Sequence, residues 1–178
     1  MIKFLAIDSS LVNTGAAVGV IKDGLWVQEI HLHTTEKTKS KQIRASSDTI
    51  ARCKTTYDFV KGLIDYVKPT IIFIETPSGS QNSSAMKSYG ATCQLIASLS
   101  PAPIQVTPNE VKIASVGKKT ASKADMIKWA STKHPDVEWA KHKDGTFKNK
   151  NEHMADAIAI AYAGVKTEEF ERLKSLIR

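Results

Sequence analysis

Two acidic residues directly follow apolar runs that are typical of buried strands. Asp8 comes after residues 2–7, and Glu75 comes after residues 71–74. A short, largely apolar run of this kind indicates a strand that is covered on both faces. If the two strands are neighbours in one sheet, both carboxylates emerge at the same edge of that sheet.

A histidine and a third acidic residue lie on a helix of small residues near the end of the chain. Residues 151–164 read NEHMADAIAIAYAG, and alanine recurs at every second position from Ala155 to Ala163. His153 and Asp156 are three residues apart, so they project from one helical face. Small residues allow such a helix to lie close against a sheet. Gly164 is expected to end it in the left-handed conformation.

Three carboxylates that are brought together would repel one another, which favours a bound cation. Like charges at short range resist joint ionisation, and hard cations such as Mg²⁺ prefer oxygen ligands. Two such ions about 4 Å apart can activate a water and stabilise the leaving oxygen of a phosphodiester. The residues alone leave open a second interpretation, in which each acid is an ordinary strand-end or surface residue.

The formal net charge of +7 is concentrated in two stretches of the chain. Residues 112–150 contain ten lysines and four acidic residues, and residues 36–54 contain six basic and two acidic residues. Basic stretches of this kind suit a polyanion such as nucleic acid. A solvated lysine-rich surface is the alternative.

The remaining pattern predicts an α/β fold with a five-stranded mixed sheet flanked by helices, in a single domain of residues 1–178. An antiparallel meander opens the chain, with Asp23-Gly24 as a hairpin turn. Later strands are expected to be parallel. In the first expected helix, of about residues 50–68, apolar residues recur at helical spacing and include Ile50 and Tyr57. The expected strands are residues 2–7, 16–21, 25–33, 71–74 and 104–106, and the expected helices are about 50–68, 84–99, 108–116, 122–134, 151–164 and 167–177.

The sequence indicates a cytoplasmic protein that does not enter a membrane. No apolar run reaches the length of a membrane span, and the first ten residues lack a signal-peptide pattern. Cys53 and Cys93 are isolated and are expected to be reduced. Residues 135–150 are polar and lysine-rich and are expected to be mobile. Within them, Trp139 either stacks on bases or packs in the core.

Four segments resemble, in order and spacing, the signature of RuvC-type Holliday junction resolvases, and the match runs from residue 1 to about residue 164. The segments are Asp8-Ser9-Ser10-Leu11-x-Asn13-Thr14-Gly15, Ile74-Glu75, His153-x-x-Asp156-Ala157, and the basic segment Thr107-Pro108-Asn109-Glu110-Val111-Lys112 with Gly117 and Ala121-Ser122-Lys123. The chain's size and loops look more like those of a phage-encoded member than of a bacterial one.

The resemblance implies an RNase H-like fold and a homodimer that nicks two opposed strands of a four-way DNA junction. It implies two Mg²⁺ ions per active site, for which Mn²⁺ can substitute. Lys112 and Lys123 would act near the scissile phosphate, so they join the metal site as catalytic residues. The implied metal ligands are Asp8, Glu75, His153 and Asp156. The implied DNA-binding residues are Asn13, Lys112 and Lys123. Lys118 and Lys119 are extra basic charge at a place where the family often has a glycine, and they are expected to bind DNA as well.

The sequence also departs from the family pattern. Many members carry an aromatic residue in the loop after the strand-end glutamate, where it helps to open the junction. Residues 76–83 contain none, so such contacts must come from elsewhere, or the junction is opened less. The basic segment of residues 37–52 is longer than expected.

Three alternatives remain at this point. The chain could be a nuclease with broader activity on flaps and forks, or a junction-binding protein without activity. Asp8 with Ser9-Ser10 and Thr14-Gly15 also resembles the phosphate loop of actin-like ATPases and sugar kinases, but those proteins need two such domains. The helix of residues 84–99 is a candidate dimer element, although its apolar face also suits a core.

Overall fold

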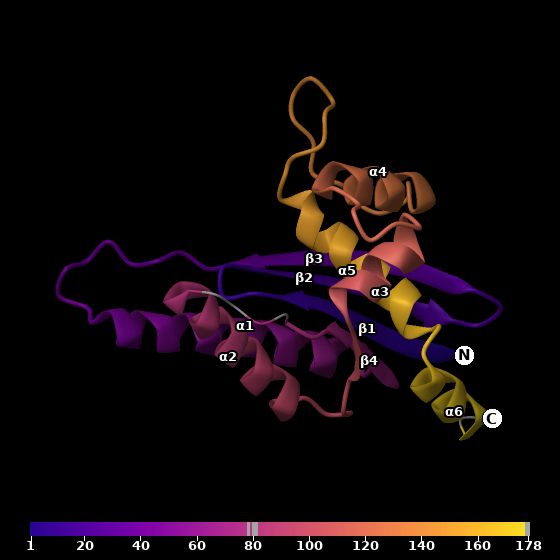
Figure 1. The fold of residues 1–178 in the computed structure, drawn as a ribbon, viewed down its shortest axis with the longest axis horizontal. Helices are drawn as coiled ribbons and strands as arrows, with labels where there is room; N and C mark the ends of the chain where they lie inside the picture. Colours follow the sequence, from indigo (N-terminus) through magenta and orange to yellow (C-terminus); the bar gives the residue numbers. More distant parts are fainter. Residues whose placement is uncertain (78, 80–81, 177–178) are drawn as a thin grey trace.

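A five-stranded mixed sheet forms the centre of the fold, as the sequence predicted (Figure 1). The computed structural model describes residues 1–77, 79 and 82–176, and only the backbone of Ser83 and Ser84. Part of the predicted polar loop of residues 76–83, and Ile177, lie outside the described residues. The strands are β1 (Ile2–Ser9), β2 (Asn13–Ile21), β3 (Leu25–Thr34), β4 (Ile71–Glu75) and β5 (Ile104–Val106).

The strands lie in the order β3-β2-β1-β4-β5. β1, β2 and β3 form the predicted antiparallel meander. β4 runs parallel to β1 with Ile7 opposite Ile74, and β5 runs parallel to β4. Because β1 and β4 are parallel neighbours, the residues that follow Ile7 and Ile74 leave the sheet at one edge. This pairing is the condition on which the predicted carboxylate site depends.

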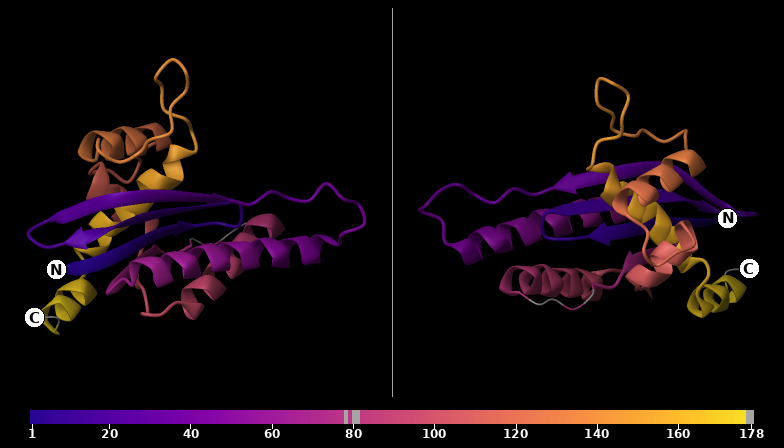
Figure 2. Two further views of the ribbon diagram at one scale, coloured as in Figure 1. Left: turned by 180° about the vertical axis from the view of Figure 1, so that it is seen from behind. Right: turned by 45° about the horizontal axis from the view of Figure 1, so that its top comes forward.

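Helices cover both faces of the sheet and bury two separate apolar layers (Figure 2). α1 and α2 cover one face, while α3, α4 and α5 cover the other. β1 serves both layers because its side chains alternate between the two faces: Phe4 and Ala6 face α5, and Leu5 and Ile7 face α1. The helices are α1 (Ala45–Val67), α2 (Ser83–Ser98), α3 (Pro108–Ser115), α4 (Lys123–Lys133), α5 (Asn151–Gly164) and α6 (Glu168–Leu176).

The helices α3 and α4 begin where the sequence predicted them to begin. Thr107 accepts a hydrogen bond from the backbone N–H of Glu110, and Ser122 accepts one from that of Asp125. Each acidic residue bonds back to the cap, so both helices start with a capping box. Among the described residues, no helix has both the length and the apolar character needed to cross a membrane.

α1 differs from its prediction in both start and orientation. It begins at Ala45, and Ile50 is 69% exposed while Tyr57 is 40% exposed. The second half of the helix buries Val60, which belongs to the predicted spacing, and Leu63 against the sheet. The N-terminal half of α1 reaches beyond the strands (Figure 1), so its apolar side chains have no sheet beneath them. The predicted apolar stripe is therefore wrong for the first half of this helix.

Gly164 has a different role from the one predicted. It is the last residue of α5, and the following residue, Val165, has a right-handed backbone with φ −69°. A Cβ atom at position 164 would lie 2.1 Å from a ring carbon of Phe73 on β4. The glycine is therefore needed for close packing of α5 on the sheet, and the predicted left-handed cap is wrong.

We predict that Gly164→Ala destabilises the protein. The added methyl group must displace a buried aromatic ring, and overpacking of this kind costs about 1–3 kcal/mol. Gly62→Ala is the matched control, because Gly62 lies within α1 and a Cβ atom there would meet nothing within 4 Å. The control should gain about 0.5–1 kcal/mol from helix propensity. Urea denaturation measures both values; equal free energies of unfolding for the two variants would refute the packing argument.

Candidate active site

The parallel pair of β1 and β4 brings Asp8 and Glu75 to one edge of the sheet. Ile7 lies opposite Ile74 in the register, so the two carboxylates follow paired positions. Both residues are half-buried, and the side chain of Asp8 is 19% exposed. Asp8 and Glu75 are therefore neighbours, as the two apolar runs predicted.

A glycine on β2 allows the first turn of α5 to approach these carboxylates. Gly15 pairs with Asp8 across β1 and β2. A Cβ atom at position 15 would lie 2.0 Å from the backbone oxygen of His153, so only glycine permits this approach. As a result, Nδ1 of His153 lies 2.9 Å from Oδ2 of Asp8, which accepts a hydrogen bond from it.

Glu75 and Asp156 have strongly raised pKa values. Burial raises the pKa of Glu75 to about 8, and the negative charges of Asp8 and Asp156 add to the effect. Burial also raises the pKa of Asp156 to about 7, with a further increase from Asp8. Near neutral pH, the protein alone thus keeps part of this cluster protonated. The carboxylates behave as a group whose joint ionisation requires an added positive charge.

His153 is held among negative charges. Burial lowers its pKa, but the hydrogen bond to Asp8 and the charges of Asp8, Glu152 and Asp156 together outweigh burial and leave the pKa raised. A protonated His153 supplies one of the positive charges that the cluster needs, and it lowers the pKa of Asp156.

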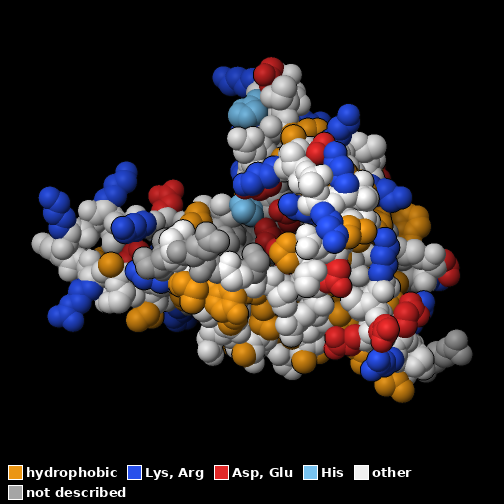
Figure 3. Space-filling view, viewed as in Figure 1, with side chains coloured by type: hydrophobic (Ala, Val, Ile, Leu, Met, Phe, Trp, Pro, Cys, Tyr) orange, Lys and Arg blue, Asp and Glu red, His pale blue; other side chains and the backbone are white. Residues whose placement is uncertain are grey.

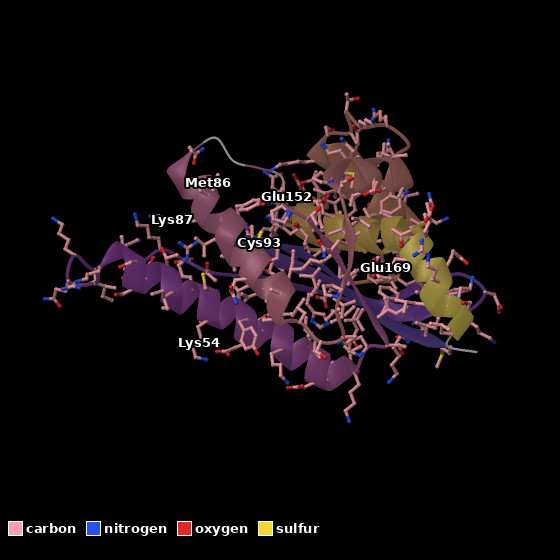
Figure 4. The ribbon with its side chains drawn as sticks, turned by 60° about the horizontal axis from the view of Figure 1, so that its bottom comes forward. Lys54, Met86, Lys87, Cys93, Glu152 and Glu169 are labelled. Atoms are coloured by element: carbon pink, nitrogen blue, oxygen red, sulfur yellow. The ribbon has the colours of Figure 1, made fainter. Side chains whose placement is uncertain are left out.

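Glu152 is a fourth carboxylate at the site that the sequence analysis did not single out. Its side chain lies 3.3 Å from Nε2 of His153 and 2.9 Å from Nζ of Lys123 on α4. Figure 4 labels Glu152 at the start of α5. The signal in the sequence was its spacing, because Glu152 lies four residues before Asp156 and so shares its helical face.

The predicted DNA-binding lysines fall into two groups. Lys112 on α3 lies near enough to the carboxylates to lower the pKa values of Glu75 and Asp156. Lys123 pairs with Glu152, and its pKa is raised chiefly by that pairing. Lys118 and Lys119 are exposed between α3 and α4, where Lys118 lies 3.5 Å from Asp125. Figure 3 shows the result as acidic side chains in a hollow bordered by basic ones.

Asn13 and Trp139 are occupied by contacts within the protein. Oδ1 of Asn13 accepts a hydrogen bond from Thr34, which joins the start of β2 to the end of β3. Its contact with DNA stays a prediction. Trp139 is buried, and its indole N–H donates to the backbone oxygen of His134. The structure thus favours the packing interpretation of Trp139 over base stacking.

The side chains at this site fit a hard divalent cation in their chemistry, but they are not yet arranged around one. Within the described part of the chain, no three His, Cys, Asp or Glu side chains already surround a single point as metal ligands. Asp8 is directed to His153, and the pKa values of Glu75 and Asp156 reflect uncompensated burial and repulsion. Metal binding would therefore require small movements of these side chains and the loss of their protons.

Solved structures with the same fold are Holliday junction resolvases. Thermus thermophilus RuvC in complex with a Holliday junction substrate matches with a TM-score of 0.65 and 17% identity over 98% of this chain and 97% of that chain. A second T. thermophilus RuvC structure gives 0.61 and 16% over 97% and 96%. Fowlpox virus resolvase in complex with substrate Holliday junction DNA gives 0.54 and 12% over 99% of both chains.

This likeness establishes the architecture of the chain. In the part of the chain that the structure describes, the mixed five-stranded sheet with six helices has the α/β, RNase H-like fold of RuvC, as the sequence motifs predicted. A scan against protein-family models matches none of them, and a search of the curated proteins finds no significant match. The activity of this chain must therefore be argued from its own site.

The raised pKa values predict that the metal-free protein loses stability as the pH rises. A carboxylate whose pKa is higher in the folded protein binds more protons when folded, so the free energy of unfolding falls with pH between the two values. This window runs from 4.5 to about 8 for Glu75 and from 3.8 to about 7 for Asp156. The raised pKa of His153 acts in the same direction above 6.5.

Thermal unfolding in EDTA between pH 5 and pH 8 measures this effect. The melting temperature should fall by several degrees, because about 1 kcal/mol corresponds to about 2–4 °C in a chain of this size. Glu75→Gln should flatten the profile, and Mg²⁺ should raise the melting temperature most at pH 8. A melting temperature that is constant with pH, or a Glu75→Gln profile equal to that of the wild type, would contradict the assigned coupling.

Proposed function

We propose that this chain is a metal-dependent endonuclease that resolves four-way DNA junctions by paired nicks in opposed strands. The observation that carries the proposal is the cluster of Asp8, Glu75 and Asp156, in which partial burial and neighbouring charges raise the pKa of Glu75 to about 8 and that of Asp156 to about 7. The cluster lies among lysines, in a fold shared with resolvases that were solved with Holliday junction DNA.

Each residue has a distinct role in this proposal. Asp8, Glu75 and Asp156 hold two Mg²⁺ ions, which would activate a water molecule and stabilise the leaving oxygen. His153 orients Asp8 through their 2.9 Å hydrogen bond. It also supplies positive charge beside the acids.

The two lysines nearest the acids contact the DNA. Lys112 and Lys123 bind the phosphates on either side of the cut and offset negative charge as it develops. Lys123 is suited to this role because its side chain is 80% exposed and its only recorded ion pair, among the described residues, is with Glu152. Lys118 and Lys119 extend the same basic surface away from the acids.

The competing functions fit the site less well. A protein that only binds junctions gains nothing from several half-buried acids beside its lysines, since the acids repel DNA phosphates. A nuclease with broader activity on flaps and forks would use the same chemistry. That alternative differs only in the shape of the DNA it accepts, and it is separated from the proposal by the choice of substrates.

A homodimer would place two such sites on the two strands, and the face of α1 and α2 is suited to it. A groove of about 620 Å³ lies between these helices and is lined largely by apolar atoms of residues such as Ile50, Tyr57 and Leu95. Figure 4 shows the two helices side by side. Ile50 and Tyr57 are exposed there although both are apolar in character, which is typical of a contact surface.

Asp8→Asn should abolish cleavage and retain junction binding. Loss of one metal ligand should lower the rate by at least about 1,000-fold, equivalent to about 4 kcal/mol, while removal of a negative charge favours DNA binding. Cleavage of a synthetic four-way junction, a flap and a linear duplex is compared in Mg²⁺, Mn²⁺ and EDTA. Asp65→Asn is the matched control, since Asp65 is an exposed acid on α1 that pairs with Lys61 and does not line the groove between α1 and α2.

Symmetric nicks on the junction alone, dependent on the metal and lost only with Asp8→Asn, would support the proposal. Equal cutting of flaps would replace it with a broader branched-DNA nuclease. Full activity of Asp8→Asn would overturn the assignment of the site.

Tyr57→Asp should convert a dimer into a monomer. The introduced charge would be buried without a partner in the proposed interface, where it is strongly unfavourable. Tyr66→Asp is the matched control, because Tyr66 is an exposed tyrosine on the same helix that does not line the groove. Analytical ultracentrifugation measures the mass of each variant. A monomeric wild type, or an unchanged dimer in Tyr57→Asp, would contradict this interface.

A further inference from the structure

A second cavity adjoins the carboxylate site and has no role in the proposed chemistry. It has a volume of about 690 Å³ and lies between α4 and the segment that precedes α5. This volume falls within the range of about 300–1,000 Å³ that is typical of small-molecule sites. Its apolar lining comes from Ala124 and Ile127 on α4 and from Phe147.

Phe147 stands on a short hairpin within residues 135–150. Lys141 and Phe147 form an antiparallel bridge, and the N–H of His142 donates to the oxygen of Thr146 over 2.8 Å. Gly145 turns the chain with φ +85°, a conformation that side chains disfavour.

The hairpin is fixed to the start of the helix that carries the site. Asn151 is fully buried as the first residue of α5, and its amide group both accepts from and donates to the backbone of Ala140, over 3.1 and 2.7 Å. The ring of Trp139 packs edge-on against Phe147 with centroids 6.3 Å apart. These contacts hold Phe147 in a defined position relative to Glu152 and His153.

Phe147 remains 37% exposed although apolar groups surround it. Lysines border the same space: Lys123 and Lys128 line the cavity, and Nζ of Lys141 lies 5.5 Å from the ring centroid of Phe147. Among the described residues, Glu152 is the one acidic group in the lining, and its pair with Lys123 neutralises it. An exposed aromatic ring between cations is the combination that binds single-stranded nucleic acid, since bases stack on the ring and phosphates meet the cations.

We propose that this cavity binds one unpaired nucleobase of the DNA strand whose phosphate enters the carboxylate site. The base stacks on Phe147 and contacts Ile127, and Lys123 and Lys128 bind the flanking phosphates. A base within a duplex is covered on both faces and cannot reach the ring. A base at a strand exchange point costs less to unstack. The inference rests on the proposed function, because the DNA strand that supplies this base is the one cut at the carboxylate site.

The test is a binding cycle between protein variants and DNA that lacks single bases. All variants carry Asp8→Asn, so that the DNA stays intact. Fluorescence anisotropy gives Kd for four-way junctions with one abasic nucleotide placed in turn at each position near the exchange point. At one position the missing base should weaken binding about 5- to 100-fold, the range expected for one stacking contact.

The variants at position 147 assign that contact. Phe147→Ala and Phe147→Leu should weaken binding of the intact junction, and the abasic site should cause no further loss of affinity in them. Phe147→Tyr should still lose affinity when the base is missing. Leucine preserves apolar packing in the hairpin, so it separates stacking from folding. Trp26→Ala is the control: Trp26 is an exposed aromatic residue on β3, and it should behave as the wild type.

Two further measurements separate the possible outcomes. In the Asp8→Asn protein with Phe147 unchanged, a photoreactive 5-iodouracil at the sensitive DNA position should cross-link to Phe147. A cross-link to another residue would overturn the inference. The inference would also be overturned if the missing base raised Kd equally in all variants, or if it did not raise Kd for the protein with Phe147 unchanged. A single-stranded oligonucleotide with the same abasic series should show the same dependence on Phe147. If it does while junctions bind no better than linear duplexes, the cavity stands and the proposed function fails.

Discussion

Partial burial and mutual repulsion of neighbouring carboxylates are the constraint on which the candidate site depends. Asp8 and Glu75 are fixed by a parallel strand pair, and Asp156 is fixed by a helix packed on that pair, so none can move far away. The raised pKa values of Glu75 and Asp156 show how the protein alone accommodates them: it keeps protons. His153, Lys112 and Lys123 supply part of the missing positive charge. A divalent cation would supply the rest.

Close packing of α5 is what holds the acids at this separation. The helix rests on the sheet at both ends through glycines, with Gly15 of β2 against the backbone of His153 and Gly164 of α5 against Phe73. Alanines between these contacts lie in the core without exposing backbone. The two sides of the molecule differ: lysines gather on α3 and α4, which pack on α5, while the other side carries the largely apolar groove between α1 and α2. One face thus suits DNA and the other suits a second chain.

The sequence predicted the sheet and the site because their signals are local. Apolar runs ending in Asp8 and Glu75 marked two strands, and helical spacing joined His153 to Asp156. The remaining features depend on distant contacts. The role of Gly164 depends on Phe73 far along the chain, and the exposure of Ile50 depends on where the sheet ends beneath α1. The hairpin at Phe147 depends on the buried amide of Asn151, which the sequence placed in the helix of residues 151–164 without indicating its bonds to Ala140. The spacing of four residues between Glu152 and Asp156 was the local signal that places Glu152 at the site.

Titration calorimetry with Mn²⁺ at pH 6.5 tests the central claim most directly. Performed in two buffers with different ionisation enthalpies, it gives both the number of ions bound and the number of protons released. We expect two ions per chain and a net release of protons, because Glu75 and Asp156 are largely protonated before the metal binds. Asp156→Asn should lose at least one ion and part of the release. Absence of saturable binding, or binding without proton release, would contradict the account of this site as a carboxylate cluster that a metal completes.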